Sequence, residues 1–225
     1  MNIRQCGQVE DPDKGVGYQL VSREIMLYLD PQTGEILRRF DNPWTGASNE
    51  VIHVANDPVN QRPGFGINTD GSERAFTYRD VNGQYLINYE IPLFYKNAMG
   101  GDYQKYVGGS YHATEIFDFN GDVAELLDAS KPVAYPVISW VRLAPWLPWM
   151  EMNGRAGMLY FNAMGRKLEN YEQLSEVIKA EIAQQYPDYT TPPPLDDPRR
   201  NETSWTFMKK IIDSRTEEAA TTPQH

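Results

Sequence analysis

The stretch 79-RDVNGQYLINYEI-91 decides the fold class of this chain. Large side chains recur in it at every second position, which places them on one face of a β-strand. They are Tyr85, Ile87, Tyr89 and Ile91. The sequence Asp-Val-Asn-Gly at 80–83 is typical of a tight turn, so segments 74–79 and 84–93 are predicted to form an antiparallel hairpin.

Segments with a similar pattern lie on both sides of this hairpin. They cover residues 20–29, 36–40, 50–55, 111–119, 133–143 and 158–162. After residue 170 the apolar period becomes helical, with one helix at 170–185 and a last helix capped by Thr203. This order predicts a mainly β (α+β) protein, namely a lipocalin-like antiparallel β-barrel of about eight strands with C-terminal helices packed on it. A two-sheet sandwich is the alternative.

The length of 225 residues suits one β domain with extensions. Residues 1–17 are polar and contain glycine, so we predict an irregular N-terminal segment. The single domain is expected to span 18–216, and the tail at 217–225 is expected to be disordered.

Charge and apolar content exclude several classes of partner. The formal net charge is −10, and so acidic a surface repels phosphate backbones and anionic lipid headgroups. No apolar run reaches the about 18 residues that a membrane helix needs. Cys6 is the only cysteine, and the first residues lack the apolar core of a secretion signal. These features predict a cytoplasmic protein without a disulfide that binds neither nucleic acid nor membrane.

Motifs for metal, nucleotide and nucleophile chemistry are absent from the sequence. The chain has three histidines, and their spacing is not that of a zinc site. It contains no Walker loop, no dinucleotide-binding loop and no G-x-S-x-G elbow. We therefore expect no metal and no cofactor, and the chemistry left is acid–base work by the protein's own side chains.

His53 is the first candidate for a general base. It interrupts an apolar face formed by Val51 and Ala55 and precedes a long loop with proline and glycine at 56–71. A neutral imidazole in a pocket exchanges protons near neutral pH. The alternative is a structural histidine held by hydrogen bonds.

A second group of candidates lies on the predicted strands 111–119 and 133–143. His112 and Glu115 fall on opposite faces of their strand, so only one of them points inward. An inward Glu115 needs a partner, because an unpaired buried carboxylate is costly. Arg142, two residues from Trp140 on the neighbouring strand, can supply the positive charge, and Arg155 is the alternative.

The chain is rich in aromatic residues, with 14 tyrosines and 5 tryptophans. Most of them are expected to fill the β core, and the others suit the walls of a pocket for a flat organic ligand. The candidate wall residues flank a glycine-rich segment at 95–109 or cluster beside prolines. They are Tyr95, Tyr103, Tyr106, Tyr111, Trp140, Trp146 and Trp149.

Several segments together carry a family resemblance. They are 28-YLDPQTGE-35, 42-NPWTG-46, 54-VANDPVN-60, 139-SWVR-142, 145-PWLPWM-150 and 201-NETSW-205. In this order they resemble the family called domain of unknown function 1838, over about residues 20–212. A fungal type of chalcone isomerase resembles that family.

The resemblance implies a cofactor-independent isomerase, a cyclase of aromatic polyketide-type secondary metabolites. The expected reaction closes a chalcone to a flavanone, as in flavonoid biosynthesis, by a histidine-assisted intramolecular oxa-Michael addition. His53 is the match for the base histidine, and His112 is the second choice. Arg142 and Tyr111 are expected to stabilise the enolate oxygen, while Glu115 and the aromatic wall bind the substrate.

Two other functions stay open. A non-catalytic, lipocalin-like carrier binds a hydrophobic small molecule without turnover. An interaction module uses the proline–tryptophan segment 145–150 and the C-terminal arm. The expected binding partner is a small aromatic molecule. Association into a homodimer is a further possibility.

Overall fold

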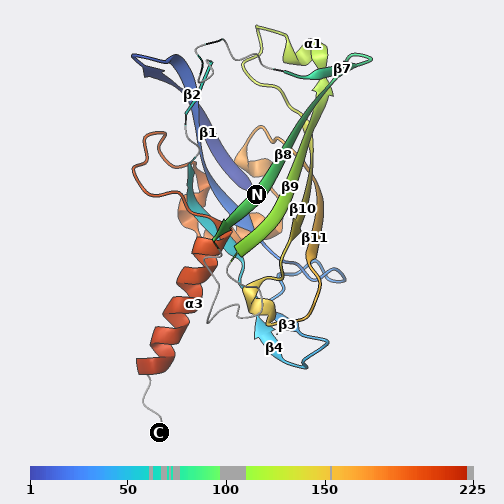
Figure 1. Ribbon diagram of the computed structural model, residues 1–225, viewed down its shortest axis with the longest axis vertical. Coiled ribbons are helices and arrows are strands. Elements are labelled where there is room, and N and C mark those ends of the chain that lie inside the picture. Colours follow the sequence, from blue (N-terminus) through green and yellow to red (C-terminus); the bar gives the residue numbers. More distant parts are fainter. Residues whose placement is uncertain are drawn as a thin grey trace. The chain divides into compact units, whose positions relative to one another are not determined.

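The computed structural model describes residues 1–60, 63–66, 70, 72, 77–96, 110–152 and 154–221 (Figure 1). Its described strands form antiparallel sheets of four, five and two strands. The predicted mainly β class with C-terminal helices is therefore confirmed. Among the described residues no sheet closes into the predicted eight-stranded barrel.

The chain divides into two compact units. Unit 1 consists of Met1–Asp41, Ser48–Ala75 and Leu174–His225, and unit 2 consists of Asn42–Ala47 and Phe76–Gln173. The two units alternate along the chain, and no proline- or glycine-rich linker marks each change. For that reason the sequence pointed to one domain at 18–216.

The main sheet of unit 1 is built on an N-terminal hairpin. β1 (Asn2–Asp11) pairs with β2 (Gly15–Met26) along its whole length, and β2 also pairs with β5 (Val54–Asn60) and β6 (Gly64–Phe65). The prediction of an irregular segment at 1–17 is therefore wrong. β1 is a polar strand in which half-buried and exposed positions alternate, so it lacks the apolar period that reveals a strand in sequence.

A small hairpin and two helices complete unit 1. β3 (Arg39–Asp41) pairs with β4 (Ser48–Glu50), while α2 (Glu176–Gln185) is followed by the 3-10 turn η3 (Pro187–Thr190). The predicted helix at 170–185 is shorter than expected, because Ser175 takes the N-cap position of α2. The residues fully buried in unit 1 include Val21, Ile182 and Met208.

The last helix, α3 (Ser204–Thr221), begins where the sequence predicted. The amide of Thr206 donates to Oγ1 of Thr203 over 3.2 Å, which confirms the cap. Trp205 and Met208 are its buried residues on the side facing β5. The prediction of disorder from residue 217 is wrong up to Thr221, since the Thr-Glu-Glu-Ala-Ala run at 216–220 has good helix formers. Residues 222–225 lie outside the described residues.

Unit 2 contains one five-stranded antiparallel sheet, seen as the long green to orange strands in Figure 1. Its order is β11 (Leu159–Arg166), β10 (Val137–Ala144), β9 (Ser110–Asp122), β8 (Gln84–Lys96) and β7 (Arg79–Val81). The predicted hairpin is confirmed at its turn, where Asn82 and Gly83 have φ of 55° and 80°, and in its second strand. Its first strand was predicted at 74–79 and lies at Arg79–Val81, while residues 74–76 lie outside the described residues. Short helical turns α1 (Val123–Leu126), η1 (Pro148–Met150) and η2 (Tyr171–Gln173) follow β9, β10 and β11.

Replacing Gly121 by alanine is expected to destabilise unit 2. An added Cβ would lie 2.6 Å from the ring of Tyr85, which is only 2% exposed and opposes Gly121 across β8 and β9. Overpacking of this kind costs about 1–3 kcal/mol. The matched control is Gly165→Ala on β11, where a Cβ meets no atom within 4 Å. Urea unfolding of both variants measures the difference, and equal midpoints would contradict the prediction.

Candidate functional site

An ion pair on the sheet of unit 2 joins two predicted site residues. Glu115 on β9 and Arg142 on β10 are register partners, and Nη1 of Arg142 lies 3.2 Å from Oε1 of Glu115. The side chains are only 17% and 14% exposed. The structure therefore pairs Glu115 with Arg142, the first of its two predicted partners. The role of Glu115 in substrate binding stays a prediction.

Five aromatic side chains share the face of the sheet that holds this ion pair. By register, Tyr89, Phe117, Phe119, Trp140 and Phe161 share that face with Glu115 and Arg142. We call these five residues the aromatic face. Their ring centroids follow one another at 6.1 Å (Tyr89–Phe119), 6.4 Å (Phe119–Phe117), 6.2 Å (Phe117–Trp140) and 5.8 Å (Trp140–Phe161).

The aromatic face is open enough for a ligand to contact it. Tyr89 is 52% exposed, and the other four rings are half-buried. The indole Nε1 of Trp140 is buried, and it has no hydrogen-bond partner among the described residues. A half-buried aromatic surface that contains a carboxylate, a guanidinium and an indole N–H can stack a flat molecule and also hydrogen-bond its oxygen atoms.

The other predicted residues of unit 2 do not join this site. His112 is exposed on the opposite face of β9, against the ring of Phe94 at 4.5 Å. Trp146 packs on Trp44 at 6.3 Å, and its Nε1 donates to the carbonyl of Arg155. Trp149 is buried in η1.

The glycine-rich segment is only partly described. Tyr95 and Tyr111 are register partners at the end of β8 and β9, and only their backbone is described. Tyr103 and Tyr106 lie outside the described residues. The prediction that the tyrosines of this segment form the wall of a pocket is therefore not tested.

His53 belongs to unit 1 and forms a different cluster. Its Nδ1 accepts a hydrogen bond from the amide of Tyr28 over 3.1 Å, and its ring stacks on that of Tyr28 at 5.9 Å. Burial, followed by the charge of Arg38, lowers the pKa of His53, so the imidazole is neutral near pH 7. The neutral ring therefore carries its proton on Nε2, where it is a donor. This hydrogen bond favours the structural alternative over the role of a base.

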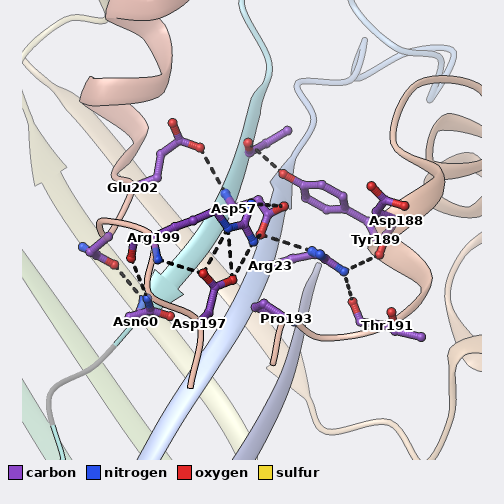
Figure 2. A network of polar contacts seen from close by, with 12 residues as sticks. Arg23, Asp57, Asn60, Asp188, Tyr189, Thr191, Pro193, Asp197, Arg199 and Glu202 are labelled. Carbon is purple, nitrogen blue, oxygen red and sulfur yellow. Dashed lines mark hydrogen bonds and ion pairs between the residues drawn. The ribbon is translucent and has the colours of Figure 1, made fainter. Parts of the chain in front are cut away.

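A larger polar network in unit 1 had no signal in the sequence (Figure 2). Asp57 on β5 accepts two hydrogen bonds from Arg199, at 2.8 and 3.1 Å, and lies 3.2 Å from Nε of Arg23 on β2. The side-chain hydrogen bonds to Asp197 and Asp57 raise the pKa of the Arg199 guanidinium. Arg23 also donates to the carbonyls of Asp188 and Thr191.

The same network holds the start of α3. Glu202, 7% exposed, accepts a hydrogen bond from the amide of Asp57 and forms an ion pair with Lys210. Tyr189, from η3, donates to the carbonyl of Ala55 over 2.9 Å. Burial, with a smaller contribution from Asp57, raises the pKa of Tyr189, so its phenol stays protonated. The network therefore attaches the arm 187–203 to β2 and β5, and we assign it a structural role.

Fold and site define the chain as a mainly β protein of antiparallel sheets with a half-buried aromatic face. Residues 1–212 match the model of the family described as "Protein of unknown function (DUF1838)", and the chain belongs to this family. No curated protein and no solved structure matches the chain. Within the described part of the chain, no helix is long and apolar enough to span a membrane.

Proposed function

We propose that unit 2 binds a flat aromatic small molecule on its aromatic face. The observation that carries the proposal is the ion pair of Glu115 and Arg142 among five aromatic rings. Rings provide stacking area, and the two charged groups offer one acceptor and one donor to a hydroxylated ligand. We also propose that further strands enclose the bound ligand, as the strands of a lipocalin do.

Cyclisation of the bound molecule is the second candidate function. What favours it is that Glu115 and Arg142 present a carboxylate and a guanidinium side by side. In a 2′-hydroxychalcone, Glu115 would take the phenol proton and the phenolate oxygen would attack the β-carbon of the enone. Arg142 would stabilise the enolate oxygen, and the proton would return to the α-carbon, which gives a flavanone without any other reactant. In this version Glu115 replaces His53 as the base.

Binding is tested by the quenching of tryptophan fluorescence with 2′-hydroxychalcone and its flavanone. We expect saturable quenching in the wild type. Trp140→Phe should lose most of the quenching and retain affinity in competition experiments, because phenylalanine still stacks. Arg142→Gln should weaken binding about tenfold, the loss of one charge-assisted hydrogen bond.

Two further variants make this experiment decisive. The pair Glu115→Gln with Arg142→Gln leaves no unpaired buried charge, so it separates lost binding from lost folding. His112→Gln, on the opposite face of β9, is the matched control and should bind as the wild type does. No quenching by either compound, or equal quenching in Trp140→Phe, would refute the site. Loss of enone absorbance above the buffer rate, abolished in Glu115→Gln, would select the cyclase over the carrier.

A further inference from the structure

His53 holds a hairpin of unit 1, residues 28–37, by a hydrogen bond. The strands of this hairpin touch at Leu29 and Ile36, and the amide of Leu37 donates to the carbonyl of Tyr28 over 2.8 Å. The amide of Tyr28 then donates to Nδ1 of His53. Its ring also stacks on the imidazole. His53 thus binds the hairpin to the segment before β5, and the carbonyl of Arg38, directly after the hairpin, accepts a hydrogen bond from the amide of Val51 in the same segment.

Charged and titratable groups from two more elements face this histidine. Arg38, directly after the hairpin, forms an ion pair of 3.3 Å with Glu181 of α2, whose side chain is 5% exposed. Arg38 lowers the pKa of His53, while Glu181 and the carbonyl of Leu37 raise it. Tyr186, which follows α2, stays a neutral phenol because burial and Glu181 raise its pKa.

The hydrogen bond from Tyr28 requires a neutral imidazole. A protonated ring carries hydrogen on both nitrogens and has no lone pair for an amide donor. Protonation would therefore set the N–H of His53 against the N–H of Tyr28. The buried carboxylate of Glu181 would attract the new charge instead.

We propose that protonation of His53 opens the hairpin 28–37, so that unit 1 has a closed form at neutral pH and an open form in mild acid. This goes beyond the proposed ligand site and does not depend on it. The pKa of closed His53 lies below its ordinary value of 6.5, so the open form binds the proton more tightly. As the pH falls from 6.5 to the pKa of the closed form, the open fraction rises about tenfold per pH unit and then levels off.

Hydrogen exchange of the full chain, followed by mass spectrometry and corrected for the intrinsic pH dependence, tests this proposal. The protection of peptides that cover 28–37 should fall in the wild type between pH 7.5 and 5. His53→Asn places an acceptor oxygen at the position of Nδ1 at every pH, so protection should not change with pH. His53→Ala leaves the Tyr28 amide without its acceptor, so protection should be low throughout.

Two more variants complete the test. Glu181→Gln removes a charge that raises the pKa of closed His53, so the open fraction should level off at a lower pH and reach a higher value than in the wild type. His112→Asn, an exposed histidine on the sheet of unit 2, should leave the wild-type profile unchanged. Equal pH profiles in the wild type and His53→Asn would overturn the proposal, as would a fall in protection that is uniform over unit 1.

Discussion

Asp57→Ala is expected to lower the free energy of unfolding by about 3 kcal/mol, because the change removes the carboxylate that pairs with both Arg23 and Arg199. The side chain of Arg23 is 12% exposed, and its Nε lies 3.2 Å from Oδ1 of Asp57 (Figure 2). Arg199 retains Asp197 as a partner and loses the two hydrogen bonds to Asp57. The effect should appear as a lower urea midpoint at an unchanged slope.

The controls for this prediction separate charge from shape. Asp57→Asn keeps the size of the side chain and removes its charge, so it should lose most of the same stability. Asp11→Ala removes an ion pair of 3.5 Å with Lys14 and the hydrogen bonds that Asp11 accepts from the amides of Asp13 and Lys14, and it should cost less than Asp57→Ala because these contacts lie at the surface. A loss at Asp57 no larger than the loss at Asp11 would mean that the network of Figure 2 is not needed for stability.

Trp205→Ala should have the largest effect on stability in the chain, about 3–5 kcal/mol. Trp205 is 4% exposed in the first turn of α3, one turn from Met208, which is 1% exposed. Truncation leaves a cavity where α3 contacts β5, and the helix has few other buried residues to hold it there. Circular dichroism during thermal unfolding measures the change.

A tryptophan at the surface provides the comparison for this variant. Trp44 is 49% exposed and lies beneath the guanidinium of Arg155 at 4.8 Å. Trp44→Ala should cost about 1 kcal/mol, since it removes the cation–π contact with Arg155, the ring contact with Trp146 and little buried area. Equal losses in the two variants would show that α3 is not fixed by its buried tryptophan. Trp205→Phe should recover part of the stability and thereby exclude a failure to fold.

Much of unit 2 was readable from single residues in the sequence. The alternation of Tyr85, Ile87 and Tyr89 predicted a strand that carries these side chains on one face, and Asn82-Gly83 predicted its turn. A buried carboxylate of Glu115 requires a positively charged partner, and Arg142, two residues from Trp140 on the next strand, was the first candidate. The alternation of the strand and the residues of the turn are local signals, because a strand's period and a turn's φ angles depend on neighbouring residues only.

Less of unit 1 could be predicted from the sequence, for two physical reasons. The strand β1 is polar on both sides, so its order comes from backbone pairing with β2 and leaves no apolar period. The network around Asp57 joins residues more than 140 positions apart, and such contacts have no signature in one sequence. The motifs 54–60 and 201–205 are separate segments in the sequence, and the hydrogen bonds of Glu202 to Asp57 and Pro58 make them neighbours in space.

The mainly β class, the turn at 80–83, the cap of α3 at Thr203 and the family follow from the amino-acid sequence, because periodicity, turn residues and motifs are local features of the chain. Which residues meet in space depends on the three-dimensional fold. In the fold, Glu115 and Arg142 share a face of the sheet with five aromatic rings, and His112 lies on the other face. Nδ1 of His53 accepts a hydrogen bond from the amide of Tyr28. Strand register and the pairing of distant segments fix these contacts, and neither property can be read from local sequence.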